Sequence, residues 1–594
     1  SGCYTKNMWF YEVAPTKIVR SGAAVFTYHS ETELFIGQLV LIPVGKQSLQ
    51  GVITKNVIKP AYETKAILES IEATPLPKPL IDLSWWLSEY YRTPMATVLQ
   101  TVLPRGLTKN RRTPKAQEAA GAVRARTQIV LNTDQATAVS KIMTTTSETV
   151  LLQGVTGSGK TEVYKEIARQ TLAEGRSVIV LVPEISLTSQ IIDDFAGEFE
   201  HVLVTHSHMT EAERHLAWKK ALDSPIPLVV IGPRSALFMP VPKLGAVLVD
   251  EAHEPSYKQE QAPRYSALRA ASVLGKAAGA RVVLGSATPL VADRYVAEAH
   301  GAPIIFLPKP ARGSAKATHT TLVDMKKREN FKKHRFFSDQ LLHTIEQNVA
   351  SSRQTLIFHN RRGSASTTLC ESCGWTAECP RCYVPLVLHA DRYTLSCHIC
   401  DHKIKVPTDC PECHSANIIH KGIGTKLIES ELQRLFPKAV IARFDGDNAN
   451  SETVAERYKE LYDGAIDIAI GTQVVAKGLD LPKLHTVGVI QADNGLALPD
   501  FAAPERAFQL LAQVVGRVGR DERDTNVIVQ SYQPTHPVIQ FGLAQDYEGF
   551  YKFALAERSR AGFPPFRYLL QLTNVYKTEA AAIRNAKVLV QELR

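Results

Sequence analysis

The stretch that decides the fold is Gly154-Val155-Thr156-Gly157-Ser158-Gly159-Lys160-Thr161. It follows a short apolar run, Val150 to Leu152, and precedes a helical pattern that begins at Glu162. A glycine-rich loop between a strand and a helix lets backbone N–H groups surround phosphate oxygens, and the helix N-terminus adds positive potential. In such a loop Lys160 reaches the β- and γ-phosphates and Thr161 ligates Mg²⁺. The sequence therefore predicts that residues 154–161 bind ATP and Mg²⁺.

A second motif, which is acidic, follows about ninety residues later. The apolar run Ala246 to Val249 ends in Asp250-Glu251-Ala252-His253. A parallel sheet places its ligand chemistry at the carboxyl ends of its strands, so Asp250 can hold Mg²⁺ while Glu251 orients and deprotonates water. With the phosphate loop, this pair predicts nucleotide hydrolysis.

Short β-branched runs alternate with helical stretches on both sides of these motifs. This rhythm predicts parallel sheets covered by helices on both faces. One series comprises residues 150–152, 178–182, 228–231, 246–249 and 282–284, and a second comprises residues 355–358, 440–443, 466–470, 486–490 and 526–530. We therefore expect two RecA-like α/β lobes, the second interrupted by an insert.

The second lobe contains Gln513-Val514-Val515-Gly516-Arg517-Val518-Gly519-Arg520. Arg517 and Arg520 are three residues apart and so share one helical face. Arginines placed there can neutralise charge on the transferring phosphoryl group if the lobes close. We assign Gln513, Arg517 and Arg520 to catalysis, together with Lys160 and Glu251.

The overall composition favours a nucleic-acid partner. The chain has 594 residues, too many for a single core, and its 69 Lys and Arg against 59 Asp and Glu give a net charge of +10. No apolar run approaches the roughly 20 residues that span a bilayer, and the N-terminus lacks the pattern of a secretion signal. We expect a monomer in the cytoplasm with no membrane partner.

Eight of the nine cysteines form four C-x2-C pairs. Two such pairs supply the four thiolates of a tetrahedral zinc site, so the eight predict two Zn²⁺. We favour a nested arrangement, in which the two inner pairs bind one ion and the two outer pairs bind the other. An interleaved arrangement is also possible. The spacing does not favour iron–sulfur clusters, and a reducing compartment disfavours disulfides. The expected ligands are Cys370, Cys373, Cys379, Cys382, Cys397, Cys400, Cys410 and Cys413.

At this point the sequence resembles superfamily 2 helicases and, among them, the PriA family of bacterial replication-restart helicases. The resemblance rests on GVTGSGKTEVY (154–164), LVPEISLTSQ (181–190), GPRSALF (232–238), DEAHEPSYKQ (250–259), GSATP (285–289), FHNRRGSA (358–365), GTKLIESEL (424–432), GTQVVAKGLDLP (471–482) and QVVGRVGR (513–520). These runs lie in family order over about 400 residues.

The resemblance implies an ATP-driven 3′-to-5′ motor on single-stranded and forked DNA that restarts replication and loads the primosome. It implies primosome proteins and single-strand-binding protein as partners, nested zinc pairing, and nucleotide binding by Gln135. It also implies that Ser286, Ala287 and Thr288 link nucleotide state to lobe movement. It implies that Arg234, Thr472 and Lys477 contact the DNA strand. An aromatic-rich loop from Tyr257 through Arg264 to Tyr265 is expected to sense single-stranded DNA by stacking on its bases. The alternative is that these tyrosines are ordinary core residues.

The sequence also departs from the family pattern. Phe26, Gly37 and Lys65 match positions that hold a 3′ end, but Thr27 stands where an aspartate is usual. Trp85 and Trp86 are expected in a helical core. The expected divisions are an N-terminal β-rich domain (1–104), a basic linker where a winged helix is usual (105–128), lobe 1 (129–312), lobe 2 (313–368 and 415–545), the cysteine insert (369–414) and the start of a C-terminal domain (546–594).

Two other functions stay open at this stage. The chain could serve chiefly as a scaffold for primosome assembly, with unwinding dispensable. It could also be an RNA helicase, as Asp250-Glu251-Ala252-His253 suggests.

Overall fold

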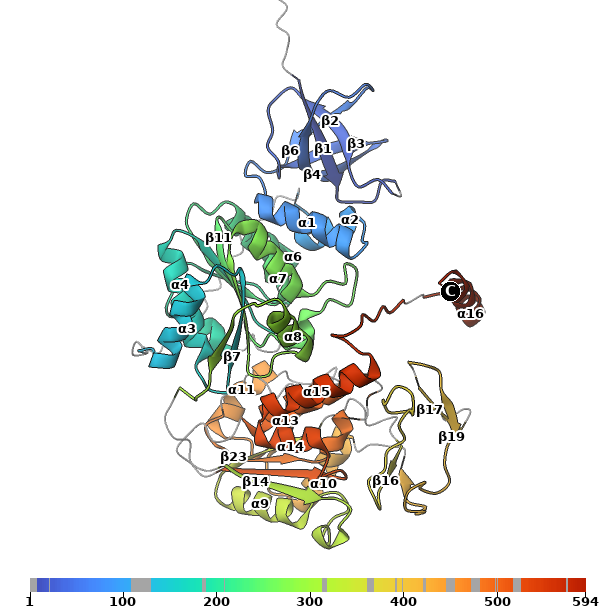
Figure 1. Cartoon of the computed structure of the whole chain (residues 1–594). Coiled ribbons are helices and arrows are strands. Elements are labelled where there is room, and N and C mark those ends of the chain that lie inside the picture. The colour runs from blue at the N-terminus through green and yellow to red at the C-terminus, as the bar shows by residue number, and fades with distance from the viewer. Residues whose placement is uncertain are drawn as a thin grey trace, which may run out of the picture.

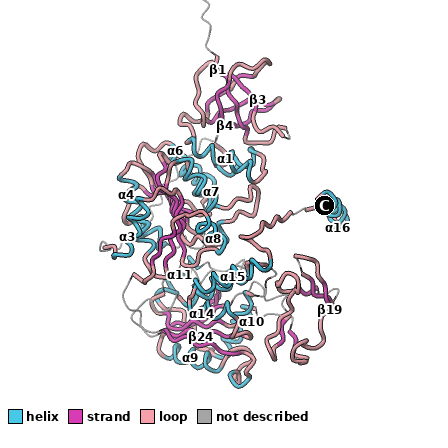
Figure 2. The backbone as a smooth tube through the Cα atoms, in the orientation of Figure 1, coloured by secondary structure: helices cyan, strands magenta, loops and turns pink. Residues whose placement is uncertain are grey.

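The computed structural model of the chain has its two parallel sheets one below the other, with a β-rich domain at one end (Figure 1). Figure 2 shows helices on both sides of the strands in each lobe. The two-lobed α/β fold with an N-terminal β domain and a cysteine-rich insert is therefore confirmed. The structure describes residues 8–20, 22–107, 130–183, 189–207, 209–311, 318–359, 368–389, 393–397, 399–419, 424–444, 454–471, 481–496, 498, 500–516, 525–572 and 575–593.

The N-terminal domain is a six-stranded sheet in the order β5-β2-β1-β4-β3-β6. Its long pairings are antiparallel, as the alternating sequence predicts. Two helices follow, and apolar residues of α1 and α2 share one core with lobe 1. The elements are β1 (Trp9–Pro15), β2 (Phe26–Ser30), β3 (Leu39–Val44), β4 (Gln47–Val57), β5 (Lys65–Ala66), β6 (Glu69–Ser70), α1 (Lys78–Tyr90) and α2 (Met95–Val102).

Lobe 1 is built on a seven-stranded parallel sheet in the order β13-β7-β12-β11-β8-β10-β9. Every residue of β8 and of β11 is buried, because helices cover both faces of the sheet. Its strands are β7 (Thr149–Gly154), β8 (Ser177–Leu181), β9 (Val202–Val204), β10 (Val229–Gly232), β11 (Leu244–Val249), β12 (Arg281–Ser286) and β13 (Ile304–Leu307). Its helices are α3 (Thr133–Thr144), α4 (Lys160–Ala173), α5 (Ser189–Ala196), α6 (Glu211–Leu222), α7 (Ala267–Ala278) and α8 (Val291–Ala299), with short 3₁₀ turns η2 (Arg234–Phe238) and η3 (Pro255–Tyr257).

Lobe 2 has a six-stranded parallel sheet in the order β14-β24-β23-β15-β22-β21. Each apolar run of the second series matches one of its strands to within two residues at either end, so the expected βα rhythm is confirmed. The strands are β14 (Thr318–Asp324), β15 (Gln354–Phe358), β21 (Ile441–Phe444), β22 (Ile468–Gly471), β23 (Leu484–Val489) and β24 (Thr525–Ser531). The other elements are α9 (Asp339–Ala350), α10 (Thr425–Leu435), α11 (Val454–Asp463), α13 (Ala503–Val515) and α14 (Pro537–Ala544), with 3₁₀ turns η4 (Arg328–Asn330) and η5 (Ala492–Gly495).

The cysteine-rich insert lies beside lobe 2 (Figure 1). It leaves and rejoins the lobe through a short antiparallel pair, β16 (Leu369–Cys370) with β20 (Ile418–Ile419). Inside it is a three-stranded antiparallel sheet of β17 (Val387–His389), β18 (Thr394–Ser396) and β19 (Lys403–Lys405).

The last helices differ in their packing. The ring of Phe550 in α15 (Tyr547–Ala561) stacks on Phe508 of α13 at 4.1 Å between centroids. The structure thus packs α15 on lobe 2, although the sequence suggested a separate domain from residue 546. Helix α16 (Glu579–Glu592) has no buried residue and lies apart from the lobes in Figure 1. Among the described residues, no helix is both long and apolar enough to cross a bilayer.

Candidate nucleotide site, lobe interface and metal centres

The phosphate loop turns at the end of β7. Gly157 and Gly159 have φ of 77° and 76°, the left-handed region that glycine adopts without strain. Lys160 begins α4 and donates to the carbonyl of Gly154 at 3.1 Å. The hydroxyl oxygen of Ser158 is buried and has no hydrogen-bond partner within the described part of the chain. Left-handed glycines and a buried, unpartnered hydroxyl in a loop between a strand and a helix are features that a phosphate site requires.

Gln135 lies behind this loop, on α3. Its Nε2 donates to the carbonyl of Ser158 at 3.0 Å, and its Oε1 accepts from the backbone N of Asn132 at 3.0 Å. A Cβ at Gly159 would lie 2.3 Å from this Nε2 and the backbone there has a φ of 76°, so a side chain at this position would be strained and would displace the amide. In this structure Gln135 supports the loop from outside.

Asp250 stands at the carboxyl end of β11, beside the phosphate loop. One carboxylate oxygen accepts a hydrogen bond from the hydroxyl of Tyr164 at 3.2 Å. Burial and the neighbouring Glu251 raise the pKa of Asp250 to about 6, and Lys160 opposes that rise. A partly buried carboxylate in this position is suited to a divalent cation, which would neutralise it.

His253 connects this acidic motif to two other segments. Its Nδ1 lies 2.7 Å from the hydroxyl of Ser286 at the end of β12, and its Nε2 lies 2.6 Å from Nε2 of Gln513 in lobe 2. The backbone N of Thr288 also donates to the Ser286 hydroxyl, at 3.0 Å. Segments from both lobes therefore meet at one buried imidazole.

Helix α13 contacts lobe 1 through three side chains spaced four residues apart. Glu505 accepts from the backbone N of Val291 at 2.6 Å, and Gln509 donates to the carbonyl of Thr288 at 3.1 Å. Gln513 is the third, one turn further along the same face. Beyond it, a Cβ at Gly516 would lie 2.9 Å from the hydroxyl of Thr156 in the phosphate loop. The end of α13 thus reaches the nucleotide site, while Arg517 and Arg520, which follow, lie outside the described residues.

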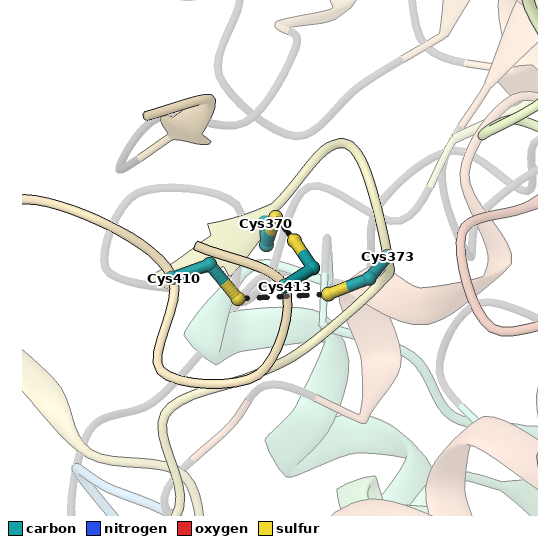
Figure 3. Close-up of side chains that lie close together, drawn as sticks. All are labelled: Cys370, Cys373, Cys410 and Cys413. Carbon is teal, nitrogen blue, oxygen red and sulfur yellow. Dashed lines mark hydrogen bonds between the residues drawn. The ribbon is translucent and has the colours of Figure 1, made fainter. Parts of the chain in front are cut away.

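The eight cysteines form two groups in the nested arrangement. Cys370, Cys373, Cys410 and Cys413 make one group (Figure 3), and Cys379, Cys382, Cys397 and Cys400 make the other. Within each group the sulfur atoms lie within 4.8 Å of one another. Two C-x2-C turns with converging sulfurs fit a tetrahedral S₄ zinc site, so the donor set suits two Zn²⁺.

Four family models match the chain. A DEAD/DEAH box helicase model matches residues 132–294 and a helicase conserved C-terminal domain model matches residues 414–522. A PriA 3′DNA-binding domain model matches residues 18–104, and a PriA DNA helicase Cys-rich region model matches residues 379–405.

A curated relative matches nearly the whole chain. The replication restart protein PriA of Treponema pallidum is 36% identical over 94% of this chain and 86% of its own length. The chain belongs to the PriA family.

Coverage differs among the relatives of this PriA-family chain. The PriA of Bacillus subtilis is 40% identical, but the match covers 75% of this chain and 55% of that protein. The structure of RecG bound to a three-way DNA junction matches with a TM-score of 0.44 at 18% identity, over 78% of this chain and 51% of RecG, too weak a likeness to carry an argument.

The expected DNA contacts of the PriA-family chain are partly described. Arg234 donates to the side chain of Gln259 at 2.7 Å and to the carbonyl of Ser256 at 2.6 Å, so it anchors the loop that carries the tyrosines. Tyr257 is 2% exposed and Tyr265 is 1% exposed. Neither ring can stack on a base in this conformation, so stacking by these two rings is wrong and the core alternative holds. Thr472 and Lys477 lie outside the described residues.

In the N-terminal domain of the PriA-family chain, Phe26 and Thr27 lie on β2, whereas Gly37 precedes β3. The hydroxyl of Thr27 accepts from that of Tyr62 at 2.8 Å. Lys65 is exposed on β5, which pairs with β2. Trp85 and Trp86 are partly buried against the shared core, as expected, and Trp86 stacks on Tyr90 at 4.9 Å.

Sequence reasoning missed Glu505 and Gln509. The signal was available as three polar residues, each four positions from the next, on a helix whose other residues are apolar apart from Arg506. Such a stripe marks a face that packs against polar backbone groups, but the sequence alone does not say which backbone.

Proposed function

We propose that this chain is an ATP-dependent DNA helicase that moves 3′ to 5′ on single-stranded DNA at stalled or recombined forks and helps to restart replication. The observation that carries the proposal is the 2.6 Å contact between Gln513 and His253, because it joins the second lobe to the acidic motif of the first. A motor needs such a connection to convert nucleotide hydrolysis into lobe movement.

The residues around the phosphate loop fit ATP and Mg²⁺. Ser158 offers a buried hydroxyl, and Gly157, where a Cβ would meet no atom within 4 Å, leaves the loop backbone open at that point. Lys160 and Thr161 would bind the phosphates and the ion, with Asp250 completing the ion's protein ligands. Bound Mg²⁺ neutralises phosphate charge and orients the γ-phosphoryl group.

Charged and polar side chains at the same edge of the lobe 1 sheet would perform the remaining catalytic roles. Glu251 would orient and deprotonate the attacking water. Arg517 and Arg520 follow Gly516, which lies against Thr156, so they would offset the charge that develops on the phosphoryl group. Ser286 and Thr288 would transmit the change in nucleotide state to α13, which contacts this segment through Gln509.

DNA binding is supported by charge and by domain content. The net charge of +10 favours a polyanion, and residues 18–104 match a 3′DNA-binding domain model. Arg234, Thr472 and Lys477 would contact the strand. Because Thr27 replaces the usual aspartate, we propose that Phe26, Gly37 and Lys65 hold a 3′ end with less selectivity for its hydroxyl.

The cysteine insert would hold two Zn²⁺ and either separate the duplex or dock partners. Structural zinc supplies folding free energy to a segment with few apolar residues. The proposed partners are primosome proteins and single-strand-binding protein. The thiolates require the reducing conditions of the bacterial cytoplasm, where the chain would act as a monomer.

A single substitution tests the assignment. Lys160→Ala should abolish DNA-stimulated ATP hydrolysis and strand displacement, since the charge on the phosphates is lost. The exposed α3 residue Lys141 provides a control, Lys141→Ala, that should leave both activities unchanged. Full ATP turnover in Lys160→Ala would rule the motor out.

Two outcomes would favour the other functions. Stimulation of ATP turnover by RNA but not by DNA would favour an RNA helicase. Restart of replication by Glu251→Gln, which would retain ATP but not hydrolyse it, would favour a scaffold.

A further inference from the structure

Tyr164 contacts the acidic motif from the helix that carries the phosphate loop lysine. It lies on α4, one turn after Lys160, and its ring is 2% exposed. Its hydroxyl is 3.2 Å from one carboxylate oxygen of Asp250. A phenol is protonated at neutral pH, so here it donates to the carboxylate. The proposed function so far gives this residue no role.

The position of the hydroxyl is fixed by β12. A Cβ at Gly285 would lie 1.6 Å from the Tyr164 oxygen and 2.8 Å from the ring carbon that carries it. The backbone at Gly285 is not left-handed, so the need for glycine is steric and not conformational. Tyr164 therefore fills a space that only a glycine leaves, and its ring has little freedom to turn away from Asp250.

Carboxylate orientation matters for the ion expected at this site. Mg²⁺ requires near-ideal octahedral geometry and uses few protein ligands, so each ligand must be well oriented. Groups that hydrogen-bond to a metal ligand set its orientation, and their loss typically weakens metal binding by about 10- to 100-fold. One oxygen of Asp250 engaged by Tyr164 leaves further lone pairs for the ion.

We propose that Tyr164 is a positioning residue for Mg²⁺, whose hydroxyl holds the Asp250 carboxylate in the orientation that ligates the ion. The inference rests on the proposed nucleotide site. Because Gly285 precedes Ser286, which contacts His253, the same hydroxyl lies against the segment that links the lobes.

The chain offers a matched control in Tyr257. This residue is also 2% exposed and also touches Asp250, but its hydroxyl donates to the backbone carbonyls of Asp250 and Leu181, at 2.7 Å and 3.0 Å. Tyr257→Phe thus removes a buried hydroxyl of the same kind beside the same residue without touching the carboxylate.

The test compares Tyr164→Phe, Tyr257→Phe and the unmodified chain by nucleotide binding and by turnover. Affinity for a fluorescent ADP analogue is measured without Mg²⁺ and at saturating Mg²⁺. We expect Tyr164→Phe to keep the Mg²⁺-free affinity and to reduce the gain from Mg²⁺ about tenfold. The half-saturating Mg²⁺ for DNA-stimulated ATP turnover should rise by a similar factor, with kcat at saturating Mg²⁺ within about threefold. Tyr257→Phe should change neither Mg²⁺ dependence.

The outcomes separate the two proposals. If the unmodified chain neither binds the ADP analogue nor hydrolyses ATP, the proposed function fails. If it does both, and Tyr164→Phe shows the Mg²⁺ dependence of the unmodified chain, the positioning role is wrong while the proposed function stands. An equal shift in both phenylalanine variants would likewise overturn it, since the effect would then come from packing.

Discussion

Nε2 of Gln513 lies 2.6 Å from Nε2 of His253, across the boundary between the two lobes. The amide nitrogen of glutamine can only donate, so the imidazole accepts at Nε2 and carries its proton on Nδ1. Nδ1 in turn donates to the hydroxyl oxygen of Ser286, 2.7 Å away. A change in the position of α13 therefore reaches the ends of β11 and β12 through one ring.

Loss of this contact should slow turnover more than it weakens ATP binding. In Gln513→Ala the Nε2 acceptor of the buried His253 loses its donor, which costs about 1–3 kcal/mol. If the contact tightens as the lobes close, kcat for DNA-stimulated ATP hydrolysis should fall by roughly 10- to 100-fold, with the ATP KM changed by less than about threefold. Steady-state kinetics measure both values.

The control for this prediction is Gln347→Ala. Gln347 lies on the exposed face of α9, away from the lobe interface, and should show kinetics like those of the unmodified chain. A Gln513→Ala enzyme with unchanged kcat and a large rise in KM would show that the contact serves binding and not coupling.

Much of this arrangement was predictable because its signals are local. The loop from Gly154 to Thr161 and the runs that became β7, β8 and β11 are short segments whose residues alone define the pattern. The cysteine pairs likewise act through local turns, although only the fold brings Cys370 near Cys413, at 3.6 Å between sulfurs.

Features that depend on distant packing were harder to predict. Tyr257 and Tyr265 looked like a stacking loop, but the core of lobe 1 buries both rings. Glu505 and Gln509 carry no motif of their own, since their partners Val291 and Thr288 are more than 200 residues away.

Removal of Glu505 should destabilise the protein strongly. Its carboxylate accepts from Arg558 of α15 at 2.6 Å, and these two side chains are 5% and 6% exposed. Glu505→Ala leaves a buried guanidinium without its partner, at a cost of about 3–5 kcal/mol. Thermal unfolding should begin at least about 5 °C lower.

A second ion pair of α15 serves as the control. Glu557 accepts from Arg560 at 2.6 Å, but these side chains are 45% and 57% exposed. A solvent-exposed pair contributes about 0–1 kcal/mol, so Glu557→Ala should shift the melting temperature by no more than about 2 °C. Equal shifts in both variants would contradict the importance of burial.

Each cysteine group should hold its own zinc ion. Cys379→Ser should lower the zinc content from two ions to one per chain, and the double variant Cys373→Ser with Cys379→Ser should lose both, because each S₄ site needs all its thiolates. Metal analysis by mass spectrometry measures the ratio. Cys3→Ser removes the cysteine outside the four pairs and should retain both ions; a loss of one ion there would contradict the pairing.

Stability should fall in mild acid because of His536. This residue caps α14, its Nδ1 accepting from the backbone N of Val538 at 3.2 Å, and burial lowers the pKa of the imidazole to about 4. The unfolded chain, with an ordinary histidine pKa near 6.5, binds the proton more readily. The free energy of unfolding is therefore at its full value, as far as this histidine is concerned, above about pH 6.5. It decreases as the pH falls towards 4, by up to about 1.4 kcal/mol per pH unit within that window.

His536→Asn keeps a capping oxygen but cannot titrate. The melting temperature of the unmodified chain minus that of His536→Asn should therefore decrease by several degrees between pH 7.5 and pH 5. Other titrating groups cancel in this difference, so a constant gap over that range would show that His536 is protonated equally in the folded and unfolded chains.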